Sequence, residues 1–310
     1  SEFAGITLWL DAADSSSITA SGGNITTWEN KVDDTVKMYP GYAHHTGGPS
    51  LDASINGKTA IKFDGNEFLQ AKKTSSSGAI WNPLGVNGAT DSTYGDFAVI
   101  FVSQTLNTVW CNGPFNFGWE GHIPGGNRYI YWDYPTHVNT RIQVGQITVN
   151  QPFLLSLYGS TTENKRILSW DGTETSGMPA QDTLVGGFYL PYNIAAQNAL
   201  FAEMLVIKGT MTDSARHRAE GYLAHKWGID LPSTHTWAQG SPYSDIKNGA
   251  DLTLYWGSSD GGENENSWEN AVSLGKKSSP LAVWFDASDL DGDGTVDTNA
   301  SGDITVWKDK

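Results

Sequence analysis

The chain has 310 residues, a formal net charge of −15 and 38% hydrophobic residues. This length is enough for one large all-β domain or two small ones, each with a substantial core. An acidic surface repels phosphate backbones, which argues against nucleic acid as a partner. The longest apolar runs, such as residues 97–102, are far shorter than the ~20 residues of a membrane-spanning helix, so no membrane span is expected.

The cysteine, glycine and aromatic content narrows the range of possible folds. A single cysteine, Cys111, leaves no disulfide framework within the chain. The first residues, SEFAG, have neither the charged nor the apolar region of a signal peptide, so localisation must be inferred from other features. The informative excess is 35 Gly together with 13 Trp and 12 Tyr. Glycine-rich turns between aromatic strands are typical of β-sandwiches and barrels.

The first part of the chain shows strand patterns. Residues 6–11 alternate and predict a strand, and a turn-rich stretch separates them from a second short strand at 25–28. The sequence TAIKFDGNEFLQA predicts a hairpin with a strand at 59–63, a turn at 64–66 and a return through Phe68 and Leu69.

The middle of the chain predicts further strands. The stretch at 71–95 is rich in Ser, Gly and Asn and predicts a long loop. The continuous apolar run DFAVIFVSQ that follows predicts a strand buried on both faces. Later strands are predicted at 115–119, 128–132, 141–144, 153–158, 166–170 and 201–207. Many short strands with almost no helix predict an all-β antiparallel sandwich.

One helix is predicted after residue 211. Thr212 is a suitable N-cap, and Gly228 can adopt the left-handed C-cap conformation. The helix is expected to cap one end of the sandwich. Helical spacing places Ala215, Ala219, Tyr222, Leu223 and Trp227 on its buried face, and Arg216, Arg218 and Lys226 on its polar face.

The chain contains an internal repeat. LWLDAADSSSITASGGNITTWENK near the start is similar to VWFDASDLDGDGTVDTNASGDITVWKDK at 283–310. Self-similarity of this kind indicates tandem modules of a longer protein, with a single duplication as the alternative. We therefore divide the chain into a sandwich at 1–237, a linker or small β extension at 238–279, and the start of a second, similar module at 280–310.

Three segments carry a family resemblance over residues 5–237. LWLDAAD, IKFDGNEFLQA and FAEMLVIKGTMTDSARHRAEGYLAHKWGIDLP together resemble the laminin-G-like, concanavalin A-like domains of large bacterial secreted and surface proteins. The resemblance implies a two-sheet antiparallel jelly roll, glycan or protein binding that is often calcium-assisted, and an extracellular or cell-surface setting. It does not fix a ligand, because one fold hosts many functions.

The second copy of the repeat contains an aspartate-rich loop. Calcium prefers several oxygen ligands, which alternating aspartates can turn inward, and Gly294 permits a sharp turn. The loop departs from an EF-hand at its twelfth position, where Ala300 stands in place of Glu. We predict a short calcium loop, with a solvated acidic turn as the alternative. Its candidate ligands are Asp289, Asp291, Asp293, Thr295 and Asp297.

The candidate ligand-binding residues are aromatic and polar. Sugar rings stack on Trp and Tyr, while their hydroxyls need Asn, Asp, Gln or His nearby. Strand alternation gives Tyr129 and Tyr131 one face and Ile130 and Trp132 the other, and one of these two sets must belong to the core. The candidates are Asn116, Trp119, His122, Tyr129, Tyr131, Trp132, Asp133 and Tyr134, with Tyr192 and Asn193 in a second stretch.

The acidic residues predict structural roles. Glu203 lies in an apolar strand and needs a cationic partner, for which Arg216 and Lys226 are the candidates. Asp11 and Asp64 end strands and are expected to cap turns.

Two signatures of hydrolases are missing from the sequence. It contains no Glu-x-Asp-x-(x)-Glu strand of the related glycosidases and no His spacing typical of a metal site. We predict a non-catalytic, lectin-like carbohydrate-binding module of an adhesin-like protein. The alternatives are a structural spacer or protein-interaction module in a surface array and, less favoured, a glycoside hydrolase.

Overall fold

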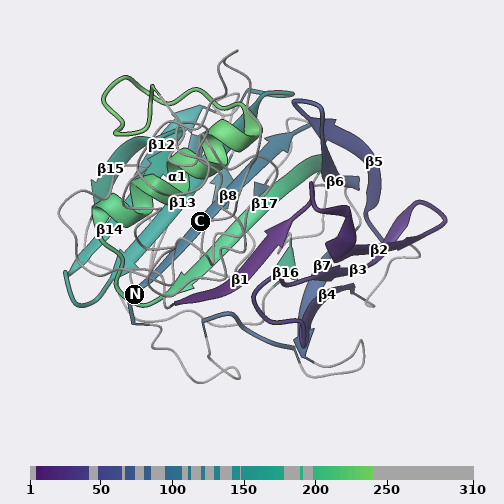
Figure 1. Cartoon of the computed structure of the whole chain (residues 1–310). Coiled ribbons are helices and arrows are strands. Elements are labelled where there is room, and N and C mark those ends of the chain that lie inside the picture. The colour runs from purple at the N-terminus through teal and green to yellow at the C-terminus, as the bar shows by residue number, and fades with distance from the viewer. Residues whose placement is uncertain are drawn as a thin grey trace, which may run out of the picture. The chain divides into compact units, whose positions relative to one another are not determined.

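The computed structural model describes residues 5–41, 48–64, 67–73, 80–84, 95–106, 111–112, 120–122, 129–132, 142–146, 148–177, 189–190 and 198–239. All of these residues belong to one compact unit, Glu2–Gly249. Within the described ranges the fold is an antiparallel β-sandwich with one α-helix, as the sequence predicts (Figure 1).

A long antiparallel layer forms the centre of the unit. Its strand order is β15 (Thr173–Gly177), β14 (Lys165–Trp170), β13 (Pro152–Ser160), β8 (Phe97–Thr105), β17 (Asn198–Lys208) and β6 (Lys58–Asp64). The first strand, β1 (Ile6–Asp11), pairs with the second half of β17, because β6 pairs with its first half. β17 therefore joins the N-terminal strand to the middle of the sheet.

The remaining strands complete the sandwich. The hydrogen-bonded order continues from β6 through β5 (Ser50–Ile55), β3 (Asn24–Glu29), β4 (Val36–Pro40), β7 (Leu69–Lys73) and β16 (Tyr189–Leu190). Strand β2 (Ile18–Ser21) lies off this path and pairs with β3. It follows the short 3-10 turn Ser15–Ser17. A separate sheet has the order β12 (Ile142–Gln146), β11 (Tyr129–Trp132), β10 (Glu120–His122) and β9 (Cys111–Asn112). The core between these parts includes Phe101, Phe153, Met38 and Ile142.

The predicted hairpin at 59–69 is wrong. Strand β6 pairs with β5 and β17, whereas β7 pairs with β4 and β16. Both edges of β6 are therefore occupied by strands from elsewhere in the chain. The segment carries the chain from one part of the sandwich to another, and local turn chemistry did not reveal this.

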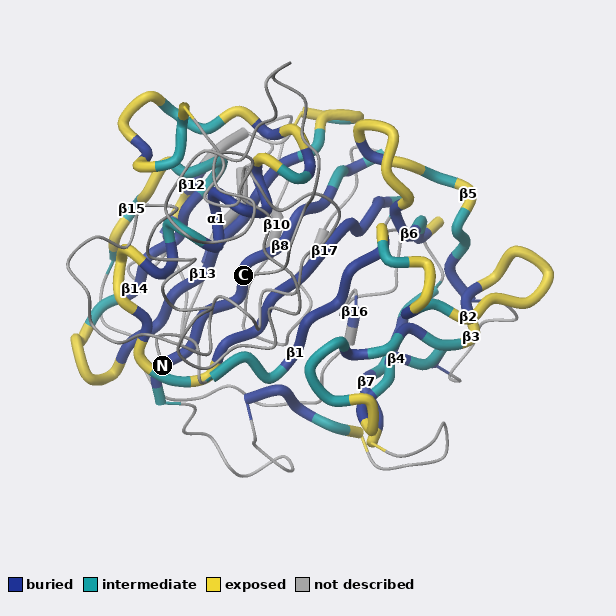
Figure 2. Tube along the Cα trace, viewed as in Figure 1, coloured by how far each residue is buried: buried dark blue, intermediate teal, exposed yellow. Residues whose placement is uncertain are grey.

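Strand β8 confirms the prediction of burial on both faces. Val99 and Phe101 belong to the main core, while Ile100 and Val102 are equally buried on the alternate face. Most of β8 is coloured as buried in Figure 2. The helix α1 (Asp213–Trp227) packs against β8 and β13. It therefore lies across a face of the sheet, rather than at one end of the sandwich as expected.

The ends of α1 confirm the capping prediction. The side chain of Thr212 accepts a hydrogen bond from Ala215 N at 3.1 Å. Gly228 adopts the left-handed conformation with φ of 67°, and its N–H donates to Ala224 O. The apolar face is buried as predicted, but Arg216, assigned to the polar face, is 1% exposed.

Asp96 fixes two turns at one end of the central strands. Its carboxylate accepts hydrogen bonds from Thr161 N (2.8 Å), Thr162 N (3.1 Å) and Thr210 Oγ1 (2.6 Å). Burial acts to raise the pKa of the Asp96 carboxyl, but the hydrogen bonds from Thr210 and Thr162 outweigh it and lower the pKa to about 2. The ionised form of Asp96 therefore stabilises the fold.

We expect Asp96→Asn to lower the free energy of unfolding at pH 7 by about 1–2 kcal/mol. Because the folded-state pKa is depressed from 3.8 to about 2, the wild-type contribution is complete above pH 4 and is lost as the pH falls toward 2. Urea unfolding across this range should show the two proteins converging at low pH. Exposed Asp230→Asn is the control, and a constant gap between wild type and Asp96→Asn would contradict the assignment.

Candidate functional site

Most of the residues predicted to bind a ligand or metal lie outside the described part of the chain. For His122, Tyr129 and Tyr131 the structure gives the backbone, in β10 and β11, where His122 and Tyr129 are direct register partners. These assignments remain predictions. The residues outside the described ranges are Asn116, Trp119, Asp133, Tyr134, Tyr192, Asn193, Asp289, Asp291, Asp293, Thr295 and Asp297.

Trp132 is a correction to the predicted binding set. Its side chain is 3% exposed and belongs to the hydrophobic core. Its ring lies 6.2 Å from that of Phe97, and the guanidinium of Arg166 lies 5.3 Å from the ring centroid. A ring enclosed in this way cannot stack on a sugar, so Trp132 is removed from the candidates.

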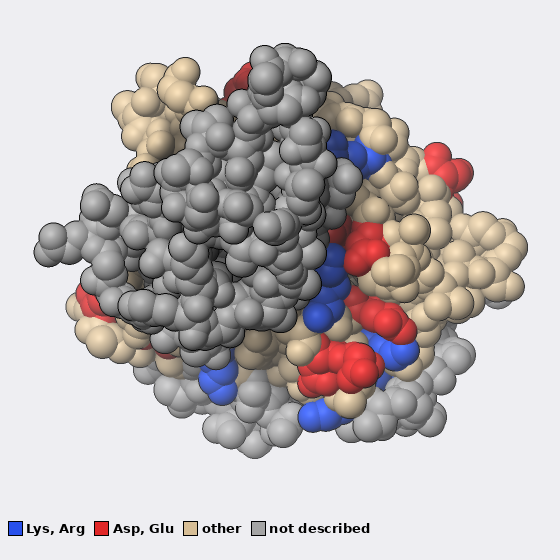
Figure 3. Space-filling view, in the orientation of Figure 1, with Lys and Arg blue, Asp and Glu red and all other residues tan. Residues whose placement is uncertain are grey.

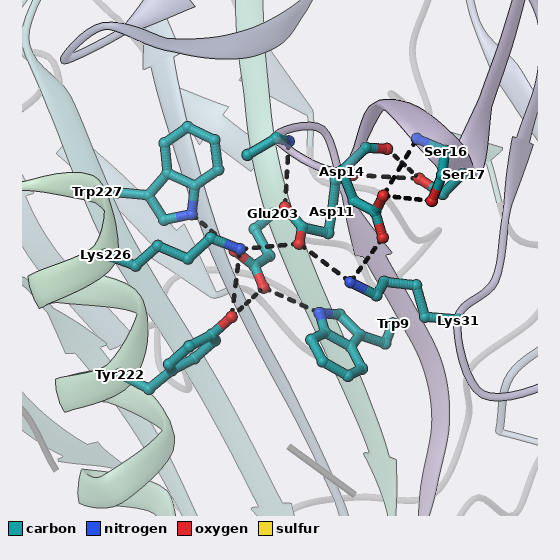
Figure 4. Close-up of polar contacts among 11 residues, drawn as sticks. Trp9, Asp11, Asp14, Ser16, Ser17, Lys31, Glu203, Tyr222, Lys226 and Trp227 are labelled. Atoms are coloured by element: carbon teal, nitrogen blue, oxygen red, sulfur yellow. Dashed lines mark hydrogen bonds and ion pairs between the residues drawn. The ribbon is translucent and has the colours of Figure 1, made fainter. Parts of the chain in front are cut away.

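A buried polar network centres on Glu203, whose side chain is fully buried (Figure 4). Oε1 accepts hydrogen bonds from Trp9 Nε1 at 2.8 Å and from Tyr222 OH at 3.0 Å. Oε2 accepts from Trp227 Nε1 at 2.8 Å and lies 2.6 Å from Lys226 Nζ. Lys226 is one of the two partners that the sequence predicted for Glu203.

Asp11 extends this network to the N-terminal strands. It is the register partner of Glu203 across β1 and β17, and its Oδ2 lies 2.8 Å from Lys226 Nζ and 3.3 Å from Lys31 Nζ. Lys31 also pairs with Asp14 at 2.9 Å. Asp11 accepts from Ala13 N at 3.1 Å, which confirms its predicted turn-capping role.

Acidic and basic side chains lie next to one another on the described surface seen in Figure 3.

The protonation behaviour of this network is that of a structural ion pair. Burial raises the pKa of the Glu203 carboxyl, and the neighbouring Asp11 charge acts in the same direction. Burial acts to lower the pKa of Lys226, but the Glu203 and Asp11 carboxylates outweigh it and raise that pKa. Lys226 therefore stays charged between two buried carboxylates.

A second network centres on the buried Arg216. Its guanidinium donates to Glu220 at 3.0 Å, to Glu174 at 2.6 Å and to Asp213 at 3.2 Å. Burial acts to lower the pKa of Arg216, but Glu220 and Glu174 outweigh it and raise the pKa further. Sequence reasoning missed this set, although the spacing of four residues between Arg216 and Glu220 was the available signal.

His217, Glu220 and His235 lie close enough together to be tested as a metal site, with their ligand atoms within 4.8 Å of one another. His235 Nδ1 accepts a hydrogen bond from Trp237 N at 3.2 Å. This assigns the ring proton to Nε2, which donates to Glu220 at 3.1 Å. Glu220 also pairs with the guanidinium of Arg216 at 3.0 Å. In this arrangement the cluster is joined through Glu220 to the ion pairs of Arg216.

Comparisons with known proteins do not assign a family, because no protein-family model and no curated protein matches the chain. Among solved structures, a Trypanosoma rangeli sialidase mutant displaying trans-sialidase activity is 13% identical over 72% of this chain, with a TM-score of 0.45. This chain spans 33% of that sialidase. Domain 4 of a GH43 extracellular arabinanase from Geobacillus stearothermophilus, in complex with arabinotriose, is 14% identical over 69% of this chain and 97% of that domain, with a TM-score of 0.41. The receptor-binding domain of botulinum neurotoxin D is 13% identical over 71% of this chain and 53% of that domain, with a TM-score of 0.41.

We expect Glu203→Gln to destabilise the domain by about 3 kcal/mol, because it removes a buried charge on which two indole N–H groups and Lys226 converge. The melting temperature should fall by roughly 10 °C in calorimetry. Glu163→Gln is the matched control, since its side chain is 37% exposed and should have little effect. Equal melting temperatures for the two variants would show that Glu203 does not carry the structural role assigned to it.

Proposed function

We propose that this chain is a non-catalytic, lectin-like carbohydrate-binding module of a secreted or cell-surface protein. The observation that carries the proposal is the register of β11 and β12. Tyr131 is the direct partner of Gln143, which is exposed, while Trp132 pairs with the buried Ile142. Directly opposed residues share a face of an antiparallel pair. Tyr131 and Gln143 therefore occupy the face opposite to the core.

This face combines the residue types that a sugar requires. A tyrosine ring offers an apolar surface for the C–H face of a sugar, and a glutamine amide both donates to and accepts from hydroxyl groups. His122 lies on the adjacent strand, β10, and Trp119 and Asp133 lie next to these strands in the sequence. Trp132 of β11 and Ile142 of β12 are anchored in the hydrophobic core. This anchoring supports a preorganised binding face.

The acidic groups support binding without catalysis. A glycosidase needs two carboxylates that flank the scissile bond, about 5 Å or more apart and accessible to substrate. The register partners Asp11 and Glu203 on β1 and β17 are both held by Lys226 in the interior, which supports a structural role for this pair. No helix in the described ranges has the length and apolar character needed to cross a membrane.

Tyr131→Ala and Gln143→Ala should each lower the affinity for a glycan by about tenfold, which corresponds to ~1.4 kcal/mol, without changing the melting temperature. A glycan array with wild type selects the ligand, and calorimetric titration measures the variants. Exposed Lys58→Ala is the matched control. Trp132→Ala should instead destabilise the fold by about 3 kcal/mol or more, because it opens a core cavity.

Three results would contradict this proposal or its binding face. If wild type binds no glycan on the array with or without calcium, the module acts as a spacer or protein-interaction unit. If it binds but both β11–β12 variants retain full affinity, the binding face lies elsewhere. Release of reducing sugar from polysaccharides would identify a hydrolase.

Calcium is the cofactor that we propose for the aspartate-rich loop of the second repeat copy, at Asp289, Asp291, Asp293, Thr295 and Asp297. The alternating carboxylates and the acidic composition support a hard cation. Calcium should raise the temperature of an unfolding transition in the full chain, and chelation should reverse the shift. Asp291→Asn combined with Asp293→Asn should abolish the shift, and a calcium response that survives these substitutions would place the ion elsewhere.

A further inference from the structure

The turn between β5 and β6 carries the sequence Asn56-Gly57. Ile55 pairs with Lys58 across this turn, so the two residues form a two-residue hairpin loop. Both have positive φ, 48° for Asn56 and 77° for Gly57, as a type I′ turn requires. Asparagine and glycine adopt this conformation at little cost. Asn56 is exposed, so water reaches its side chain.

The side chain of Asn56 extends from this turn to the end of α1. Its Nδ2 donates to Trp227 O at 2.6 Å and to Gly228 O at 3.2 Å. These carbonyls belong to the C-terminal end of the helix, where the backbone supplies no further helical donors. Asn56 therefore caps the C-terminus of α1, although it lies 171 residues before Trp227 in the chain.

This cap is joined to the buried network of Glu203. Trp227 accepts from Asn56 through its carbonyl oxygen and donates its indole N–H to Glu203 at 2.8 Å. Lys226, the preceding residue, pairs with the same carboxylate at 2.6 Å. A change in the cap therefore acts on the residues that hold α1 against β17.

An asparagine followed by glycine is chemically reactive, because glycine has no side chain to hinder its backbone nitrogen. The nitrogen of Gly57 attacks Cγ of Asn56, and the bond from Cγ to the amide nitrogen breaks. The proton of the Gly57 amide passes through solvent to the departing nitrogen, which leaves as ammonia. Water then opens the succinimide ring and gives aspartate or isoaspartate. Water is consumed and ammonia is released, and no oxidant, reductant or cofactor is required.

We propose that Asn56 is a deamidation site whose conversion releases the C-terminus of α1. The product carboxylate only accepts hydrogen bonds, so it faces the carbonyls of Trp227 and Gly228 without a donor. Its negative charge also lies at the negative end of the helix dipole. In the intact protein, the bond to Trp227 O restrains the side-chain rotation that ring closure requires, so folding slows the reaction.

Incubation of the full chain at mildly alkaline pH, followed by peptide mapping with mass spectrometry, measures conversion at Asn56. Conversion should occur in the folded chain, but several-fold more slowly than in the same chain unfolded in urea. The melting temperature should fall as the converted fraction of Asn56 rises. The Asn-Gly pairs at 87–88, 112–113 and 248–249 are followed in the same map, so their conversion is counted separately.

Substitutions test the cap without ageing. Asn56→Asp supplies the product directly and should lower the melting temperature by about 5 °C. Asn56→Gly removes the donor without adding a charge and keeps the turn, so it should lower the melting temperature by less. Asn150→Asp is the matched control and should melt as wild type, because Asn150 is also exposed and has a positive φ of 64°.

Three outcomes would overturn the proposal. Equal melting temperatures for Asn56→Asp and wild type would show that the amide of Asn56 does not hold α1. Equal rates of conversion at Asn56 in the folded and the unfolded chain would show that the contact with Trp227 does not restrain the reaction. A folded chain in which Asn56 stays intact while the other Asn-Gly pairs convert would show that Asn56 is not modified in the native protein.

Discussion

The buried carboxylate of Glu203 is the constraint on which the centre of this structure depends. An ionised carboxylate inside an apolar layer is costly unless hydrogen-bond donors and a cation surround it. Those donors come from β1 through Trp9 and from α1 through Tyr222, Lys226 and Trp227 (Figure 4). Strands β1 and β17 and helix α1 must therefore assemble together before the charge is satisfied.

This requirement explains why the sheet is buried on both faces. The helix that supplies Lys226 also covers Ile100 and Val102, which would otherwise be exposed on the face away from the main core. The Arg216 network then joins the N-terminal half of the same helix to β15 through Glu174. Polar networks of this kind specify one position of a helix on a sheet, whereas apolar contacts alone tolerate sliding. Helix α1 is therefore held in one position on the sheet.

The sequence predicted the positions of strands and of the helix better than it predicted which distant segments they contact. The caps at Thr212 and Gly228 and the double burial of β8 follow from local chemistry and periodicity, and the structure confirms them. The hairpin after β6 failed because strand pairing depends on distant segments. Arg216 was placed on the polar face because an isolated arginine is usually solvated, and its burial depends on Glu174, which lies far away in the sequence.

The candidate site was predictable only as a set of residues. Alternation in β11 separated two faces, but could not show which of them is the core, and the burial of Trp132 and Ile142 resolves this. The proposed binding face on β11 can then be compared with the buried ionisable residues around α1. The buried ionisable residues Glu203, Lys226 and Arg216 hold the helix on the sheet. Buried ionisable groups often mark active sites, but each of these three has an ion-pair partner in the interior. Under the proposed function, recognition would instead rest on the aromatic and amide groups of Tyr131 and Gln143 in the separate sheet.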